Sequence, residues 1–411
     1  MVTSQYDALV VGGGPGGAAT AYHFARAGAR VLLVEKAGYP RDKVCGDGLT
    51  PRAVAGLDAM GLRDEYRTWS RSAGLKVHGG GHVLELPWPE LSGYPSYGLA
   101  RPRTDFDQLL ARHAEKAGAT VWDSTEAVSP LVERGLVRGA VVRREGEDPV
   151  DVRADVVVAA DGASSRFAQA LGLSRDGRRP IGVAIRQYFP SQRDRDPWLD
   201  SYLELWRGDD LLPGYGWVFP MADGTLNVGL GLLNTSKGFR DTNYRRLLDD
   251  WLPTVGREWG FTPADAIGKP RSAPLPMAAN RHPPLYRGVM FVGDAAGLVN
   301  PFNGEGIDYA MESGRLAAES GLAVLASGDR ALLRRYRSGI ELRYGSYFAV
   351  GRVFVRAIGD PRVMKVATRY GLPRPALMRV VLKLLANLHE PTGGDAADRV
   401  VRALTWMAPS R

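Results

Sequence analysis

Three glycines near the N-terminus have the spacing of a dinucleotide-binding turn. Gly12, Gly14 and Gly17 fit the pattern G-x-G-x-x-G, and Glu35 follows with Lys36 beside it. The first glycine of such a turn permits a tight bend, the second lets the backbone approach a pyrophosphate, and the third lets a helix pack closely on a strand. The pyrophosphate would lie at the helix N-terminus, and the Glu35 carboxylate on a ribose diol. The alternative is a glycine turn that serves the fold alone.

The single cysteine, Cys45, is a second candidate for chemistry. It lies in a polar, glycine-rich loop, residues 39–51, with Lys43 nearby. A neighbouring cation stabilises a thiolate, the reactive form of cysteine. On the residues alone, a buried and inert cysteine is the favoured interpretation. An intrachain disulfide is excluded because there is no second cysteine.

A third candidate is a run of alternating aromatic residues. In a strand, successive side chains point to opposite faces, so Tyr215, Trp217 and Phe219 would share one face. Three aromatic residues on one face usually belong to an ordinary core. The functional alternative is the wall of a long apolar pocket.

The glycine turn needs a strand before it and a helix after it, and the sequence predicts both. The apolar run 6–11 is typical of a buried parallel strand, and a helix is expected over residues 18–27. A second strand over residues 30–34 then leads to Glu35. This context favours a true dinucleotide site over a structural turn.

Further elements would bring polar residues to the same region. A helix over residues 103–117, with Thr104 as its N-cap, would place Arg103 at the helix entrance, near a phosphate or a cofactor chain. A buried strand over 155–160 ends at Asp161, in a turn with helix-capping residues. Other strands are expected over residues 136–143, 150–153, 182–188, 202–206 and 226–232, and a helix over 308–325. Within residues 288–296, a buried strand is expected to end at the acid Asp294.

These elements predict an α/β (α+β) chain with a Rossmann-type nucleotide-binding domain, an inserted β-sheet substrate domain and a C-terminal helical region. The nucleotide-binding domain is expected in three separate segments of the chain, 1–73, 102–178 and 287–330. Between them lie a substrate-domain excursion (74–101) and the β-rich substrate domain (179–286), and the helical region (331–411) follows.

Composition narrows the class of protein. With 411 residues, 45% hydrophobic and 24% charged, the chain can bury a large core. Asp7 interrupts the first apolar run, so we expect no signal peptide and a cytoplasmic location. We also expect no membrane span and no metal site. The net charge of +8 accompanies no recognisable nucleic-acid-binding module.

The stretch 351–388 is both basic and apolar. It contains eight Lys or Arg residues against one Asp, interleaved with Val, Phe, Met, Leu and Ile. One interpretation is a solvated helical face that packs on the main body. The other is a surface that docks on anionic lipid, which would make the protein peripheral on the inner face of the cell membrane.

Taken together, these motifs resemble the FAD signature of the p-hydroxybenzoate-hydroxylase-like flavoproteins. Within that fold, residues 40–48, P-R-D-K-V-C-G-D-G, resemble the P-x-x-K-x-C-G-x-G loop of the geranylgeranyl reductases. Residues 215–220, Y-G-W-V-F-P, resemble their Y-x-W-x-F-P strand. The similarity covers residues 5 to about 390 and is greatest to the actinobacterial menaquinone reductases.

The resemblance implies an FAD-dependent reductase that saturates an isoprene double bond of a polyprenyl lipid, most readily the menaquinone tail. Cys45 becomes an active-site residue, while Tyr215, Trp217 and Phe219 would line the prenyl cavity. The implied cofactor contacts are Gly12, Gly14, Gly17, Glu35, Lys36, Cys45, Gly46, Gly48, Arg103, Ala127, Asp161, Asp294, Gly306 and Ile307.

Several alternatives stay open at this point. The chain has no second G-x-G-x-x-G for NAD(P)H, so the electron donor is NAD(P)H or another reductant. The proton could come from Cys45, a water molecule or the flavin. Geranylgeranyl diphosphate or another prenyl lipid could be the substrate, and the oligomeric state is open. Competing functions on this fold are an FAD-dependent hydroxylase or halogenase, and a flavin-binding regulatory protein.

Overall fold

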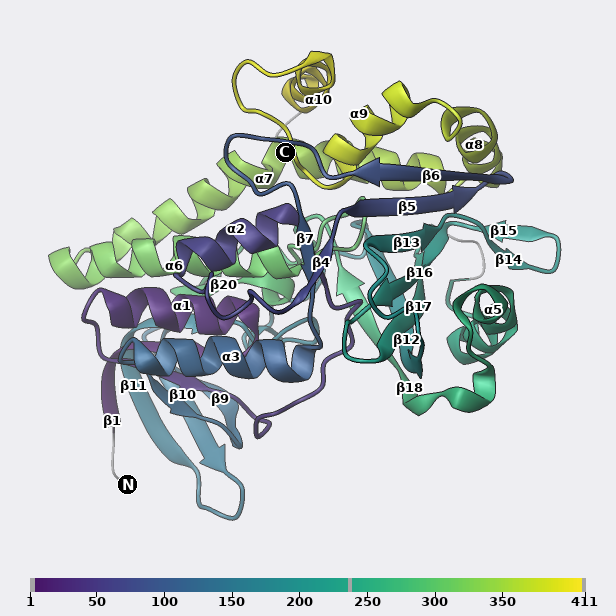
Figure 1. The fold of residues 1–411 in the computed structure, drawn as a ribbon. Coiled ribbons are helices and arrows are strands. Elements are labelled where there is room, and N and C mark those ends of the chain that lie inside the picture. The colour runs from purple at the N-terminus through teal and green to yellow at the C-terminus, as the bar shows by residue number, and fades with distance from the viewer. Residues whose placement is uncertain (1–3, 236–238, 409–411) are drawn as a thin grey trace.

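A large sheet carries the N-terminal glycine turn. The computed structural model describes residues 4–235 and 239–408, and the mostly parallel region of this sheet has the order β19-β20-β11-β1-β2-β8 (Figure 1). The antiparallel strands β10 and β9 extend it from β11. Its strands are β1 (Ser4–Val11), β2 (Val31–Val34), β8 (Thr120–Trp122), β9 (Thr125–Glu133), β10 (Leu136–Arg144), β11 (Val150–Ala159), β19 (Leu285–Tyr286) and β20 (Val289–Phe291).

The central strands are nearly continuous apolar runs because helices cover them. β1 pairs in parallel with both β2 and β11, so the carboxyl ends of all three strands meet at one edge. That edge is where an open α/β sheet binds its ligand. The covering helices include α1 (Pro15–Arg26), α3 (Arg103–Lys116) and α6 (Ile307–Ser327). A Cβ on Gly314 of α6 would lie 2.5 Å from the Gly16 oxygen, so α1 and α6 pack backbone to backbone.

A second sheet has the order β18-β12-β17-β16-β13-β5-β6 and lies beside the first. One of its faces is covered by α5 (Tyr244–Trp259), whose Trp251 ring fills the space over Gly216. The opposite face, which carries the aromatic residues of β16, turns toward the first sheet. The strands are β5 (Gly74–Gly79), β6 (His82–Pro87), β12 (Ile181–Pro190), β13 (Trp198–Tyr202), β16 (Gly214–Pro220), β17 (Thr225–Leu233) and β18 (Ile267–Pro276).

Smaller elements join the two sheets. The strands β3 (Gly48–Leu49), β4 (Ser70–Ser72) and β7 (Gly98–Ala100) form a short sheet, while β14 (Leu205–Arg207) pairs with β15 (Asp210–Leu212). The helix α2 (Pro51–Ala59) follows β3 directly, and α4 (Arg166–Ala170) follows β11. Because β3 begins at Gly48, it anchors the end of the cysteine loop.

The C-terminal region is helical, as the sequence predicts, and packs over the second sheet. Its helices are α7 (Arg334–Ile358), α8 (Pro361–Val366), α9 (Pro375–Leu385) and α10 (Ala396–Met407). Leu372, Met378 and Leu382 are buried against Leu86 and Trp88 of the β5–β6 region. None of the helices in the described portion of the chain combines the length and apolar character needed to cross a membrane.

Four local predictions were wrong. The strands expected over 150–153 and 155–160 are the single strand β11, whose first half forms a hairpin with β10 that tolerates polar side chains. The strand expected over 202–206 is interrupted between β13 and β14. β20 ends at Phe291, and a 3-10 turn begins at Gly293, where the strand was expected to continue to Asp294. Thr104 does not cap α3, because Pro102 occupies the N-cap position.

The segment expected to be β-rich also contains the long helix α5. Asn243 caps this helix by accepting a hydrogen bond from the Arg246 N–H at 3.0 Å, and Gly260 ends it in a left-handed conformation. Pro253 lies inside the helix, where proline is unusual, although the buried apolar residues keep a helical spacing. The helix shields one face of the substrate-domain sheet, which leaves the other face for the site.

Candidate functional site

The glycine turn has the shape that a dinucleotide needs. A Cβ added to Gly12 would lie 2.4 Å from the Ala160 oxygen, and one added to Gly17 would lie 1.8 Å from the Gly12 oxygen. Both positions therefore exclude a side chain. A Cβ on Gly14 would meet only the tips of two arginine side chains, at 3.4 and 4.0 Å. The first turn of α1 has neither a capping side chain nor an acidic residue, so its N–H groups fit a pyrophosphate.

Glu35 lies at the end of β2, beside this turn. Its carboxylate accepts a hydrogen bond from the Gly13 N–H at 2.7 Å, and its carbonyl oxygen accepts one from the Thr125 N–H at 2.8 Å. Ala127 follows on the same strand as Thr125, so the backbone of β9 borders the Glu35 region. Lys36 is exposed. This arrangement fits the adenosine half of FAD, with the Glu35 carboxylate toward the ribose.

Two arginines share one buried carboxylate next to the turn. Arg103 donates two hydrogen bonds to Asp107, at 2.7 and 2.8 Å, and Arg41 lies 3.0 Å from the same carboxylate. Arg41 also lies 3.5 Å from Glu35. The guanidinium tips near Gly14 are those of Arg41 and Arg103. Sequence reasoning identified Arg103 but missed Arg41, because Arg41 occupies a variable position of the cysteine-loop motif.

Asp161 lies at the carboxyl end of β11, but its side chain is used locally. One carboxylate oxygen accepts a hydrogen bond from the Ser165 hydroxyl at 2.7 Å, and the other accepts one from the Phe167 N–H at 3.0 Å. A Cβ on Gly12 would lie 2.8 Å from the Asp161 nitrogen. Its backbone therefore borders the glycine turn while its carboxylate stabilises the start of α4.

Cys45 is held as a thiol. Burial raises its pKa, even though hydrogen bonds from the Arg103 side chain and the Asp47 N–H favour the thiolate. Lys43 does not supply the expected stabilisation, because its ammonium lies 3.8 Å from the Asp294 carboxylate and is paired there. The structure therefore does not place the Lys43 ammonium as the partner that would favour a Cys45 thiolate. A protonated sulfur suits a proton donor rather than a nucleophile.

Asp47 was missed, although it lies between the two glycines of the cysteine motif. It is completely buried, and its carboxylate accepts hydrogen bonds from the Tyr188 hydroxyl and, at 2.8 Å, from the Asn227 amide. Its other carboxylate oxygen has no partner in the described structure. Burial raises the pKa of Asp47 to about 6, against the effect of these donors.

The cysteine loop lies directly on the aromatic residues of β16, here called the aromatic wall: Tyr215, Trp217 and Phe219. Their ring centroids are 5.9 and 6.2 Å apart along the strand, so the three rings do share one face. A Cβ on Gly46 would lie 3.2 Å from Phe219 and 3.5 Å from the Trp217 nitrogen, and one on Gly48 would lie 3.3 Å from Phe219. The two glycines therefore allow close approach of the loop to the rings.

The start of α6 completes the site. Gly306 is the N-cap of this helix and has no capping side chain, and the buried Ile307 follows it. A Cβ on Gly306 would lie 3.2 Å from an Asp294 carboxylate oxygen. The structure thus brings these three predicted contacts together at a helix N-terminus, which stabilises negative charge such as that of a reduced flavin.

The loop before α6 also meets the aromatic wall. Tyr215 donates a hydrogen bond to the Asn303 carbonyl at 2.6 Å. Glu305, in the same loop, accepts a hydrogen bond from the Thr50 hydroxyl. Burial, together with the nearby Asp308 carboxylate, raises the pKa of Glu305 well above its usual value. Sequence reasoning missed Glu305 as well, because its surroundings depend on contacts between distant segments.

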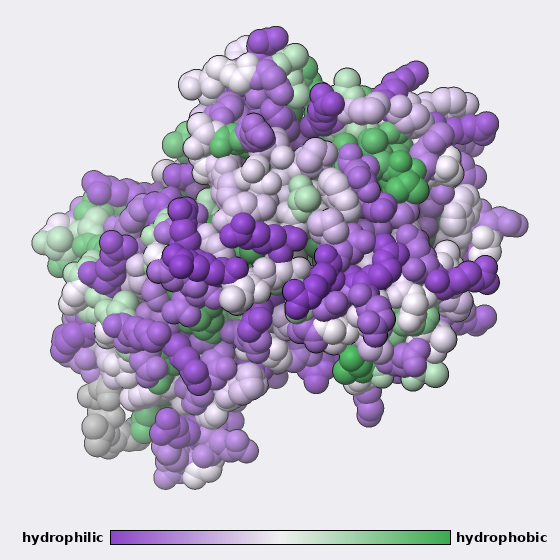
Figure 2. Space-filling view, in the orientation of Figure 1, coloured by the Kyte–Doolittle hydropathy of each residue, from purple (hydrophilic) through white to green (hydrophobic). Residues whose placement is uncertain are grey.

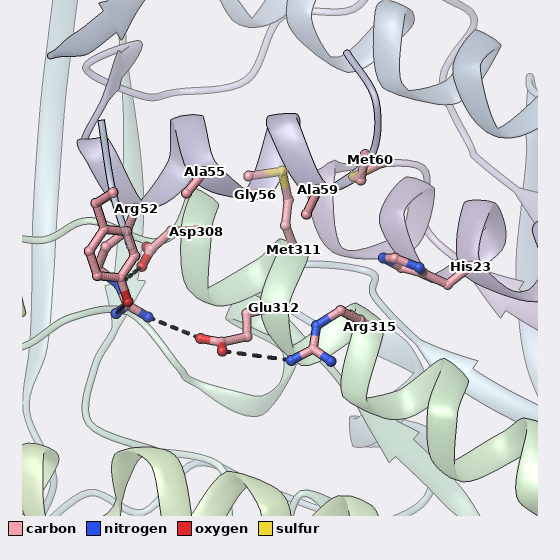
Figure 3. A pocket seen from close by; sticks show the side chains of 11 residues that line it. His23, Arg52, Ala55, Gly56, Ala59, Met60, Asp308, Met311, Glu312 and Arg315 are labelled. Carbon is pink, nitrogen blue, oxygen red and sulfur yellow. Dashed lines mark hydrogen bonds and ion pairs between the residues drawn. The ribbon is translucent and has the colours of Figure 1, made fainter. Parts of the chain in front are cut away.

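A surface hollow between α1, α2 and α6 lies outside this site (Figure 3). Arg52 crosses it, donating to Asp308 at 2.8 Å and to Glu312 at 3.0 Å. Met311 and His23 line it too. Among the described residues that line it, none belongs to the predicted site. We interpret Arg52 as a buried cross-link that fixes the first turn of α6 relative to α2.

Comparisons with known proteins agree with this geometry. An FAD binding domain family model matches residues 5–343. A menaquinone reductase of Mycobacterium tuberculosis is 40% identical over 98% of this chain and 96% of its own length. A digeranylgeranylglycerophospholipid reductase of Thermoplasma acidophilum is 33% identical over 82% of this chain and 84% of its own.

A solved structure with the same fold supports this assignment. A geranylgeranyl bacteriochlorophyll reductase-like protein of Thermoplasma acidophilum superposes with a TM-score of 0.75 at 26% identity, covering 93% of this chain and all of the other. The α/β fold and the FAD cofactor predicted from the sequence are thereby confirmed. The chain is an FAD-dependent oxidoreductase that belongs to the FAD-binding-domain flavoproteins and, among them, to the geranylgeranyl reductase family.

Proposed function

We propose that this chain saturates an isoprene double bond of a polyprenyl lipid, with the menaquinone tail as its substrate. The observation that carries the proposal is the close approach of the Cys45 loop to the aromatic wall beside the α6 N-terminus. The menaquinone reductase relative, which aligns over nearly the whole chain, supports the choice of substrate. The relative that acts on digeranylgeranylglycerophospholipids makes other prenyl lipids the second candidate.

The proposed chemistry needs a proton as well as a hydride. Bound and reduced, FAD supplies the hydride, and we propose NAD(P)H or another reductant as the source of its electrons. An isolated alkene has no carbonyl group to absorb negative charge, so protonation leads or accompanies hydride transfer and the transition state is partly cationic. Cys45, held protonated at Sγ by burial, donates the proton. The faces of the Tyr215 and Trp217 rings favour the developing positive charge.

The test is mass spectrometry of the quinones from a menaquinone-producing host that expresses the chain. We expect addition of one H2 to the menaquinone tail. Cys45→Ser should lower the amount of product roughly 100-fold or more, because a positioned acid contributes about that much to the rate. Trp217→Ala should lower it as well. Trp251→Ala is the matched control, since Trp251 lies on the opposite face of the same sheet.

Other outcomes would redirect the proposal. Saturated prenyl diphosphates or ether lipids with unchanged quinones would keep the chemistry and replace the substrate. Product that depends on oxygen consumption would instead indicate a hydroxylase or halogenase. The aromatic wall does not support that alternative. Tyr215 and Phe219 stand where the halogenase pattern W-x-W-x-I-P has its first tryptophan and its isoleucine.

We also propose that the protein is peripheral on the inner face of the cell membrane, through a surface formed by α8, α9 and the turn between them. Here it is called the C-terminal surface. In the space-filling view, a cluster of hydrophobic residues lies over the neighbouring β5–β6 region, beside this surface (Figure 2). The exposed apolar side chains of the C-terminal surface are Val363, Val366, Tyr370 and Leu377, and its exposed cations are Arg362, Lys365, Arg369, Arg374 and Arg379.

The charges of this surface match an anionic lipid headgroup layer. Within residues 4–235 and 239–408, none of those five cations forms a salt bridge with a carboxylate, and Lys365 instead lies over the half-exposed Trp206 ring at 5.4 Å. An indole at the rim suits a membrane interface. Lys383 does not contribute, because it is buried against Asp395 and Asp398.

Vesicle sedimentation tests this docking. The protein should bind vesicles of phosphatidylglycerol more tightly than vesicles of phosphatidylcholine, and Lys365→Glu with Arg369→Glu should abolish the difference, since each cation near the surface contributes about 1 kcal/mol. The control is Arg112→Glu with Lys116→Glu on α3, an equal charge change on exposed residues elsewhere. Equal loss of binding in both double variants would indicate net charge alone.

A further inference from the structure

One buried amide, that of Asn227 on β17, connects the aromatic wall to the cysteine loop. Its Oδ1 accepts a hydrogen bond from the Trp217 indole N–H at 2.9 Å. Its Nδ2 donates to the Cys45 carbonyl oxygen at 2.8 Å and to the Asp47 carboxylate at 2.8 Å. The residue is completely buried. The neighbouring strand β16 and the distant cysteine loop are therefore joined through one side chain.

The chemistry of these partners fixes the orientation of the amide. An indole N–H can only donate, whereas a backbone carbonyl and a carboxylate can only accept. The Asn227 amide offers one acceptor atom and two N–H donors, and its three partners use all of them. Asp or Leu at this position cannot reproduce that pattern, because a carboxylate lacks the donors and an isobutyl group lacks both functions.

The packing around Trp217 and the backbone conformation of Asp47 also determine how the cysteine loop is held. The Trp217 ring lies against Gly229, where a Cβ would come within 2.3 Å of it. On the loop side, Asp47 has a φ of 62°, in the left-handed region that non-glycine residues rarely adopt. The Tyr188 hydroxyl and the Asn227 amide hold the Asp47 carboxylate in place. The loop therefore keeps a strained conformation with the help of these bonds.

We propose that Asn227 is a positioning residue, which sets the Cys45 thiol relative to the Trp217 ring by holding both through one amide. The proposal rests on the proposed function, in which the thiol donates a proton to an alkene lying along the aromatic wall. Asn227 itself touches neither the alkene nor the flavin in this assignment. Its effect on catalysis comes from the distance and orientation that it imposes on the other two groups.

The first experiment does not depend on the substrate. Cys45 is the single cysteine of the chain, so the rate at which iodoacetamide adds to the FAD-loaded protein, followed by intact mass, reports on that site alone. We expect Asn227→Leu and Asn227→Asp to raise the rate of alkylation at least tenfold by freeing the loop. Asn280→Leu is the matched control, because Asn280 is a buried asparagine that donates to the Pro180 oxygen elsewhere.

The second experiment uses turnover of a prenyl substrate. Asn227→Asp should lower kcat, referred to the concentration of FAD-loaded enzyme, at least tenfold with less than a threefold change in KM. A general loss of folding would reduce the amount of FAD-loaded enzyme and leave both constants unchanged. Trp217→Phe removes the indole N–H. If Asn227 acts through that bond, combining Trp217→Phe with Asn227→Leu should cost less than the product of the two single effects.

Two results would overturn the proposal. One is alkylation of Cys45 at the wild-type rate in both Asn227 variants. The other is an increase of the same size in Asn280→Leu, which would show general loosening. Faster alkylation specific to the Asn227 variants, in a protein that reduces no prenyl substrate, would instead retain Asn227 as the anchor of the loop and refute the proposed function.

Discussion

Replacing Glu35 by Gln should separate a structural role of this residue from its role in binding FAD. The carboxylate accepts hydrogen bonds from two backbone N–H groups, those of Gly13 at 2.7 Å and Ala37 at 3.1 Å. Both carboxylate oxygens are therefore used before any ligand arrives. A glutamine presents one oxygen and one NH2 group, so one N–H donor at this buried position loses its acceptor.

The two consequences can be estimated separately. An orphaned buried donor costs about 1–3 kcal/mol of folding free energy. For a chain of 411 residues this corresponds to a fall in Tm of roughly 1–4 °C in the flavin-free protein. Loss of the charged hydrogen bond to the ribose costs about 1.5–3 kcal/mol of binding. Affinity for FAD should then fall roughly 10- to 150-fold.

The assay is titration of deflavinated protein with FAD, followed by flavin fluorescence, alongside thermal unfolding without FAD. Glu133→Gln is the control, because Glu133 is a half-exposed residue paired with Arg153 at the far end of β9. A Glu35→Gln variant with the lower Tm but unchanged affinity for FAD would refute the assignment of Glu35 to the ribose. It would leave Glu35 as a residue that only stabilises the glycine turn.

Three other substitutions test the site and its support. Because burial raises the pKa of Asp47 from 3.8 to about 6 in the folded protein, the free energy of unfolding should fall as the pH rises through that interval. Asp47→Asn should remove about 2–2.5 kcal/mol of this difference between urea unfolding at pH 4 and at pH 7, and an unchanged difference would contradict this. Arg52→Met should destabilise the protein by about 3–5 kcal/mol in urea because it leaves the buried Asp308 carboxylate without its cation, whereas Arg63→Met, at an exposed pair with Asp58, should cost less than about 1 kcal/mol. Gly46→Ala should slow turnover by pushing the loop away from Phe219, and Phe219→Leu should restore some of the rate by making room; failure of this rescue would show that the loop is displaced for another reason.

Local signals in the sequence predicted the nucleotide-binding half of the site. The strand, glycine turn, helix and second strand lie within about thirty consecutive residues, so their geometry follows from short-range rules. The face shared by Tyr215, Trp217 and Phe219 likewise follows from alternation along one strand. The contact of that strand with the cysteine loop was suggested only by the family resemblance.

The missed features depend on contacts between distant segments. Nothing local marks Asn227, because its role arises only when β17 pairs with β16 and the cysteine loop closes over both. The pairing of Lys43 was missed because its partner, Asp294, lies far along the chain. The helix α5 was missed for a local reason, since Pro253 is a residue that usually argues against a helix interior. Sequence patterns thus identified the elements better than the contacts between them.

The burial of Cys45 also bears on how long the enzyme survives in air. Reduced flavins react with oxygen to give hydrogen peroxide, which oxidises cysteine mainly in its thiolate form. A sulfur kept protonated by its surroundings is therefore a slow target for the oxidant generated beside it. Since the chain has no second cysteine to form a rescuing disulfide, an oxidised Cys45 could not be protected within the molecule. The same surroundings that keep the proton on the sulfur thus slow its oxidation.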